Sequence, residues 1–110
     1  MAGIEDTDVI DLVTHDRAAA QIVLIMSETR PWGAEGVQLD QLVAKLNTYA
    51  AYALDEHFRS RHPEVGDAAI RIQVDCVDEP DEPTARVVDD AARVLDEHGI
   101  TLVVNPLGPV

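Results

Sequence analysis

The chain has 110 residues, an apolar fraction of 46% and a formal net charge of −13, which together describe one globular domain with its own hydrophobic core. This charge disfavours binding to nucleic acids or anionic membranes and suits a soluble protein, a basic partner or cation binding. No apolar run approaches the ~20 residues of a membrane span, and no segment has the pattern of a secretory signal. Cys76 is the single cysteine, so no internal disulfide can form. We therefore expect one domain over residues 1–110 with a loose start at 1–7, in a reducing cytoplasm.

Two strands are predicted in the first part of the chain. Asp8–Thr14 and Gln21–Ser27 are rich in apolar and β-branched residues, which favour extended structure. His15–Arg17 is typical of a turn, and Ala18–Ala20 leads back into the second strand. The two strands should therefore form an antiparallel hairpin. Glu28–Gly36 follows as a loop.

A long amphipathic helix is predicted over Glu35–Arg61. Apolar residues recur at steps of three and four from Leu39 to Phe58, and Pro63 cannot continue a helix. At ~1.5 Å per residue this helix would be roughly 36–40 Å long, whereas a typical strand spans about 17–20 Å. The helix should therefore overhang the sheet and leave an end free for a partner.

Two strands and a second helix are predicted after it. Ala69–Val77 alternates between apolar and polar residues, as a strand with one wet face does. Asp81 is suited to cap a helix over Thr84–His98, and Gly99 is suited to end it. Ile100–Val104 reads as the last strand, before Pro106.

The order ββαβαβ predicts an α+β fold, a two-layer sandwich in which both helices cover one face of a four-stranded mixed sheet. Right-handed crossovers then give the strand order 1-2-3-4, with the first strand antiparallel at an edge. The second strand turns either Ile22, Leu24 and Met26 or Val23 and Ile25 toward the open face. Because exposed apolar patches mark interfaces, we expect a homodimer.

Several short motifs resemble those of a known family. They are Val9-Ile10-Asp11, Trp32 before the long helix, Lys45-Leu46-Asn47-Thr48-Tyr49 inside it, and His62-Pro63 after it. The chain resembles, over roughly residues 5–104, a family of short bacterial proteins of unknown function with an early V-I-D, a D-W before a long helix, a K-L/I-N-x-Y within it and a Y-P after it. Pro31 and His62 depart from that pattern. The resemblance implies an α+β domain and supplies no catalytic residues.

Lys45, Asn47 and Tyr49 form a polar trio in the middle of the predicted helix. A desolvated lysine can act as a nucleophile. The alternative, which we favour, is that the Lys45 stem covers apolar surface while its amine stays in water. Asn47 is expected to bond the backbone of a loop.

A ligand-binding site is predicted where the loops after the second, third and fourth strands meet. Open α/β sheets bind ligands at this carboxyl end, and the candidate residues are Arg30, Trp32, Asp78 and Asn105. The alternatives are that Trp32 packs on the start of the helix and that the acidic residues 78–82 are simply solvated. The four histidines match no metal-binding spacing, and Cys76 is expected to be an inert buried thiol.

These features favour a non-catalytic interaction or dimerisation module over an enzyme, with no cofactor and no metal. One alternative is an inhibitor or immunity-type protein whose acidic surface masks a basic partner. Another is a small-molecule binder at the sheet end near Trp32.

Overall fold

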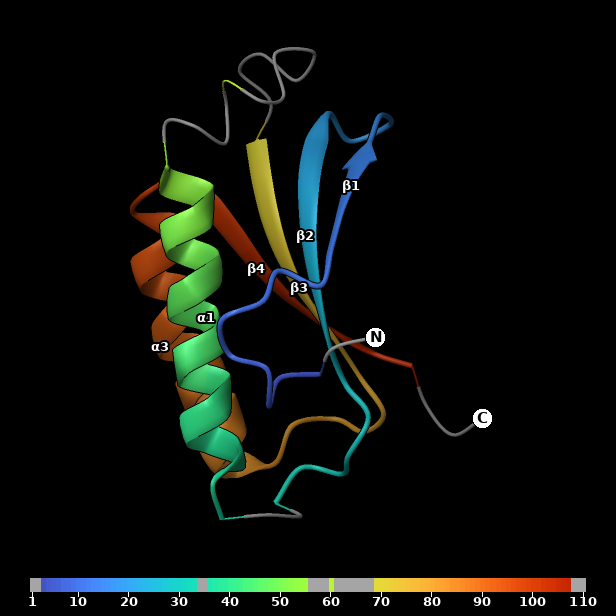
Figure 1. Ribbon diagram of the computed structural model, residues 1–110, viewed down its shortest axis with the longest axis vertical. Helices are drawn as coiled ribbons and strands as arrows, with labels where there is room; N and C mark the ends of the chain where they lie inside the picture. The colour runs from blue at the N-terminus through green and yellow to red at the C-terminus, as the bar shows by residue number, and fades with distance from the viewer. Residues whose placement is uncertain (1–2, 34–35, 56–59, 61–68, 108–110) are drawn as a thin grey trace.

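The computed structural model describes residues 3–33, 36–55, 60 and 69–107. Its elements follow the predicted order ββαβαβ (Figure 1). They are β1 (Leu12–Asp16), β2 (Gln21–Glu28), α1 (Gln38–Leu54), β3 (Ala69–Cys76), α3 (Glu82–Asp96) and β4 (Ile100–Pro106).

The four strands form one mixed sheet in the order β1-β2-β3-β4. β1 runs antiparallel to β2, while β2, β3 and β4 are parallel to one another. Both helices lie side by side on the same face of this sheet (Figure 1). The predicted two-layer α+β fold, its strand order and the antiparallel edge strand are therefore confirmed.

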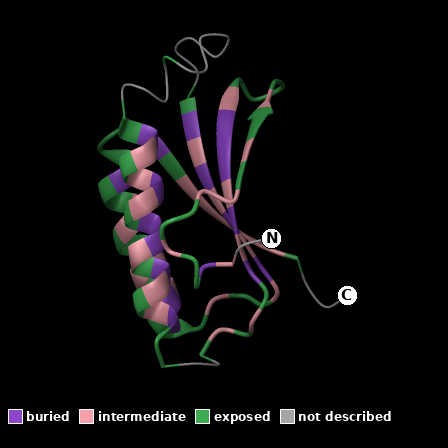
Figure 2. Cartoon of the chain, in the orientation of Figure 1, coloured by how far each residue is buried: buried purple, intermediate pink, exposed green. Residues whose placement is uncertain are grey.

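The core lies between the helices and the sheet (Figure 2). Alternate residues of β2 and β3 point into it, and α1 covers them with one stripe of side chains. The central members are fully or nearly fully buried: Ile22, Leu24, Met26, Ile70, Ile72, Val74, Leu42, Leu46, Tyr49 and Ala53. Val23 and Ile25 therefore point to the other face of the sheet, which decides between the two alternatives that the sequence allowed, although Val23 is only 1% exposed there.

The first helix is shorter than predicted. It ends at Leu54, because Asp55 adopts an extended conformation with ψ 128°. Its 17 residues span about 25 Å, close to the about 26 Å of the eight-residue strands β2 and β3. The predicted overhang is therefore absent from α1, and the continuation to Arg61 lies, apart from Ser60, outside the described residues.

The first strand begins four residues later than predicted. The backbone N–H of Asp11 donates to the Tyr49 hydroxyl at 2.9 Å, so this residue bonds to the helix layer and not to a strand. β1 then runs to Asp16, and the turn falls on residues 17–20, where Ala20 has a positive φ of 54°. A helix-bound segment, residues 3–11, therefore precedes the sheet.

The second helix has the predicted ends, within two residues. The Asp81 carboxylate accepts a hydrogen bond from the Thr84 N–H at 3.0 Å, as an N-cap does. Gly99 has a φ of 75°, the left-handed conformation in which glycine commonly follows a helix. Among the described residues, no helix is long and apolar enough to cross a membrane.

Candidate functional site

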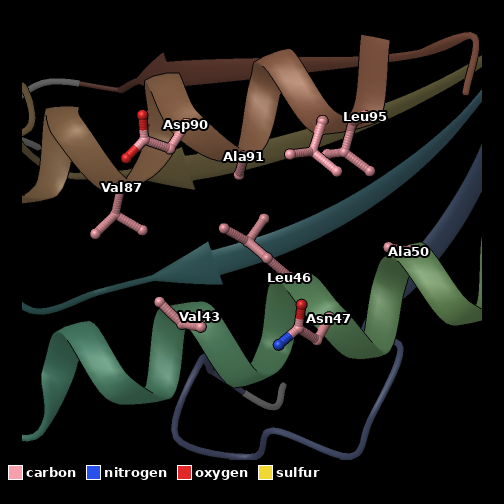
Figure 3. Close-up of a pocket in the computed structure, with 9 residues that line it drawn as sticks. Val43, Leu46, Asn47, Ala50, Val87, Asp90, Ala91 and Leu95 are labelled. Carbon is pink, nitrogen blue, oxygen red and sulfur yellow. The ribbon is translucent and has the colours of Figure 1, made fainter. Parts of the chain in front are cut away.

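A groove runs between α1 and α3 on the side of the helix layer that faces away from the sheet. Its volume is about 360 Å³, and the side chains of Val43 and Leu46 point across it toward Val87 and Ala91 (Figure 3). The complete lining is Val43, Leu46, Asn47, Ala50, Val87, Asp90, Ala91, Val94 and Leu95. Seven of these nine residues are apolar, so the groove is a hydrophobic surface open to solvent.

The groove exists because each helix carries more apolar surface than the sheet can cover. Val43 and Val94 remain 43% and 57% exposed, although both continue the apolar stripes of their helices. The small side chains of Ala50 and Ala91 leave the space between the two ridges open. Helical periodicity predicts an apolar stripe on each helix, but it does not show that Val43 and Val94 face solvent.

The exposed charged residues of the two helices that form the groove are predominantly acidic, and one of them, Asp90, lines it. Five acidic residues of α1 and α3 are exposed, against two exposed arginines, Arg86 and Arg93. Both arginines pair with carboxylates of their own helix, Arg86 with Glu82 and Arg93 with Asp90. The five acidic residues are Asp40, Glu82, Asp89, Asp90 and Asp96.

Lys45 lies on another face of α1 and holds the N-terminal segment. Its ammonium group is 2.7 Å from the Asp11 carboxylate, and it donates to the carbonyl oxygens of Gly3 at 2.7 Å and Asp6 at 3.1 Å. The side chains of Lys45 and Asp11 are only 0% and 1% exposed. The expectation of a solvated amine was therefore wrong, because residues 3–11 fold over this face and bury it.

Thr48 and Tyr49 complete the attachment of this segment. The Thr48 hydroxyl donates to the Thr7 carbonyl at 2.6 Å. The Tyr49 hydroxyl accepts from the Asp11 N–H and donates to the Ile25 carbonyl at 2.8 Å. The helix motif Lys45–Tyr49 and the early motif Val9–Asp11 are therefore in contact. The Lys45–Asp11 ion pair and the Tyr49–Asp11 hydrogen bond between them hold the fold together.

Asn47 makes no hydrogen bond to a loop within the described residues, contrary to the expectation. It is exposed and lines the groove, and the hydrogen bond to a loop backbone comes from its neighbour Thr48. The motif therefore divides between two faces of α1. Lys45, Thr48 and Tyr49 hold the N-terminal segment, and Asn47 faces the groove.

Arg30, the first candidate ligand-binding residue, is engaged in a network of its own. It donates two hydrogen bonds from its side chain to the Glu28 carboxylate, each 2.9 Å long, and one to the side-chain oxygen Oε1 of Gln41 at 2.9 Å. Burial raises the pKa of Glu28, but the hydrogen bonds from Arg30 and Gln38 outweigh it and hold the pKa below its ordinary value. Arg30 therefore serves as the counter-ion of a buried carboxylate.

Trp32 and Asp78 do come together, as predicted for the loops at the carboxyl end of the sheet. The Trp32 indole N–H donates to the Asp78 carbonyl at 3.1 Å, and its ring packs against the hydrophobic core. Asn105 instead donates to Asp75 at 3.0 Å, beside it in the sheet. The four residues thus form three separate contacts, and ligand binding at this end stays a prediction.

The remaining reactive groups have structural surroundings. Cys76 is 1% exposed, and burial raises the pKa of its thiol, which suppresses the nucleophilic thiolate. His98 lies within 3.0 Å of the Val94 carbonyl at the end of α3. In the described part of the chain, no three His, Cys, Asp or Glu side chains are placed to hold a metal ion.

The comparisons with known proteins give a family and no activity. No curated protein and no solved structure matches the chain. A sequence profile described as a family of unknown function, DUF6572, matches residues 2–108. The match includes both the N-terminal segment and the helix that binds it. Since the profile covers nearly the whole sequence, the chain belongs to the family of unknown function DUF6572.

Proposed function

We propose that this protein is a non-catalytic interaction module that binds an amphipathic, basic helix of another protein in the groove between α1 and α3. The observation that carries the proposal is the open apolar groove, with Val43 and Val94 exposed on its two sides. Contiguous apolar surface of this kind marks protein interaction sites.

The shape of the groove favours a helix as the bound element. Val43, Asn47, Ala50 and Leu54 follow one another at helical spacing along α1, and they form a ridge of about three turns. Val87, Ala91 and Val94 form the facing ridge. An amphipathic helix laid between two such ridges buries its own apolar stripe.

The charge of the two helices that form the groove favours basic residues on the bound helix. The exposed charges of α1 and α3 are mostly carboxylates, and the whole chain carries a formal charge of −13. Lysine and arginine residues flanking the apolar stripe of the partner would be attracted to this acidic helix layer. An acidic partner would be repelled.

A non-catalytic role is supported by the state of the ionisable groups. Lys45 is the side chain that the sequence offered as a possible nucleophile. Its amine is buried against the Asp11 carboxylate and is not accessible to a substrate. Arg30 is bonded to Glu28 and Gln41. The groove itself is lined by one carboxylate, Asp90, and one amide, Asn47. Such a lining can bind apolar groups, and it contains no nucleophile paired with a base.

The test uses two helical peptides of about four turns with the same leucine stripe. One has lysines beside the stripe, and its twin has glutamates. Binding is followed by fluorescence anisotropy and by amide chemical shifts. The lysine peptide should bind saturably and at least about ten-fold more tightly than its twin. Its affinity should fall as NaCl rises from about 0.05 M to 0.5 M.

The variant Val43→Gln/Val94→Gln removes apolar contact without changing charge. It should weaken binding of the lysine peptide by at least about ten-fold. Leu12→Gln is the matched control, because Leu12 is 52% exposed on the sheet. The proposal is wrong if neither peptide binds, if the twins bind equally, or if the control weakens binding as much as the groove variant.

A further inference from the structure

We infer that two copies of this chain pair antiparallel along β4, with Val103 of each copy on the two-fold axis. The pairing would join two four-stranded sheets into one. It concerns the edge of the sheet and does not depend on the groove between the helices. It gives the homodimer expected from the sequence a defined surface.

The backbone of β4 has a free side whose groups can be identified. Among the described residues the strand bonds only to β3, and the Leu107 N–H donates to the Cys76 carbonyl across that pair at 2.7 Å. Successive residues of a strand direct their backbone groups to opposite sides. The backbone N–H and C=O groups of the odd-numbered residues therefore point toward β3. The backbone groups of the even-numbered residues point outward, away from the sheet: Ile100, Leu102, Val104 and Pro106.

Proline lies where it does not disturb this free edge. Pro106 has no backbone N–H to donate. Because the backbone groups of this residue point away from β3, no hydrogen bond between β3 and β4 is lost. Its carbonyl still points outward with those of Leu102 and Val104. In the proposed pair the Ile100 N–H of each copy donates to the Pro106 carbonyl of the other. Leu102 and Val104 of opposite copies exchange both of their hydrogen bonds.

The pattern of apolar and polar residues along β4 is symmetric about Val103. Pairing around that residue sets Ile100 opposite Pro106, Thr101 opposite Asn105, and Leu102 opposite Val104. Apolar residues thus meet apolar residues, and the two polar residues meet each other. Shifting the axis by one residue to Leu102 would instead place Thr101 opposite Val103. This self-complementarity points to a second copy as the occupant.

The distribution of charge between the two edges of the sheet also favours a second copy of the chain as the partner of β4. β4 contains no charged residue over its seven positions, in a chain with a formal charge of −13. The opposite edge, β1, is five residues long and ends in His15 and Asp16. Two copies that repel each other elsewhere can approach along an uncharged edge, whereas charged edge residues discourage such pairing.

Space for the second copy exists beside the strand. A hollow of about 280 Å³ lies between the end of α3 and the start of β4. Ala92 contributes a small side chain there, and the two charged residues of its lining, Arg93 and Asp96, have opposite signs. The helix layer therefore leaves the outward side of Leu102 accessible.

The test is the oligomeric state of matched charge variants, measured by sedimentation velocity over a range of protein concentrations. The wild-type chain should sediment as a dimer, at twice its mass of 12.0 kDa. Val103→Lys and Val103→Glu should each be monomeric, because like charges would face each other across the axis. An equimolar mixture of the two variants should form a heterodimer. Gln73→Lys places the same charge on β3, opposite Val103 in register, and should leave the dimer intact.

Salt provides a second readout. Added NaCl should tighten the dimer, because it screens the repulsion between two acidic copies. The inference is overturned if the wild-type chain is monomeric at every concentration, or if Val103→Lys remains dimeric. It is also overturned if the Val103→Lys and Val103→Glu mixture stays monomeric, or if only Val43→Gln/Val94→Gln dissociates the dimer. Far-ultraviolet circular dichroism of each variant confirms that the fold is retained.

Discussion

At the scale of single residues, the pair Lys45–Asp11 connects two distant parts of the chain. Both side chains are buried, and one oxygen of the Asp11 carboxylate, Oδ2, has no hydrogen-bond partner among the described residues. Removing water from two charges is costly, so such a pair adds little net stability compared with two well-packed apolar residues. It does fix which segment covers this face of α1, because either charge alone would be buried without its counter-ion.

Replacement of one member of this pair should therefore be far more harmful than replacement of both. Lys45→Met should lower the free energy of unfolding by about 3–5 kcal/mol, measured by urea denaturation. Asp11→Leu/Lys45→Met should recover much of that loss. Arg86→Met is the control, because its pair with Glu82 is exposed, and it should cost less than about 1 kcal/mol. Equal losses for Lys45→Met and Arg86→Met would contradict the role given to Lys45.

Tyr49 should make stability sensitive to alkaline pH. Burial raises the pKa of its phenol to about 12 from the ordinary value of 10.0. Since the folded-state pKa is the higher one, the contribution of Tyr49 is complete below the unfolded pKa and is lost as pH rises through about 12. Absorbance titration of Tyr52→Phe, which leaves Tyr49 as the single tyrosine, should show this late ionisation.

Tyr49→Phe supplies the complementary measurement. It removes the partner of the Asp11 N–H and of the Ile25 carbonyl, so the free energy of unfolding at neutral pH should fall by about 1–3 kcal/mol. The variant should also lose the alkaline contribution described for the wild-type chain. If its stability kept the same dependence on alkaline pH, Tyr49 would not be the titrating group.

At the scale of elements, local sequence signals predicted the ends of α3, whereas a tertiary contact decides where β1 begins. The Asp81 cap and Gly99 fixed the ends of α3 to within two residues, because capping uses only neighbouring groups. The shift of β1 could not be predicted in this way. It depends on the hydrogen bond between Asp11 and Tyr49, which are 38 residues apart.

Two glycines test the assignment of the end of α3. Gly99 has a φ of +75° and no atom within 4 Å of an added Cβ, so Gly99→Ala should cost about 1–2 kcal/mol through backbone conformation alone. Gly36 has equal space but no positive φ. Gly36→Ala should be neutral or stabilising by up to about 1 kcal/mol. Thermal unfolding of both variants provides the comparison, and similar losses for the two would refute the conformational explanation.

At the scale of the whole molecule, the formal charge of −13 should oppose the compact state through self-repulsion. The melting temperature should therefore rise as NaCl increases from about 0.01 M to 0.5 M, over which the Debye length shortens several-fold. Circular dichroism measures the transition, and KCl should give the same curve if screening is the cause. A melting temperature that falls with salt would mean that attractive pairs dominate over repulsion.

The overall architecture could be predicted because it follows from rules that need no side-chain detail. Helical and strand periodicity gave the order of elements, and crossover handedness gave the order β1-β2-β3-β4. The sites could not be predicted as well. A helical pattern shows that Lys45 and Val43 lie on different faces of α1, but it does not show what covers each face. Residues 3–11, which cover Lys45, have no periodic pattern of their own.

The strand order also bears on how the domain is assembled during synthesis. Because the order in the sheet is the order in the chain, each new strand joins the one made before it, and no strand has to be inserted between two others. From β2 onward the sheet extends at one edge, as a ribosome releases the chain from its N-terminus. β4 is the last of the four described strands to be added, and its outward side is where a fifth strand would attach. In the proposed dimer, β4 of a second copy occupies that side, so the neighbouring strand comes from another molecule.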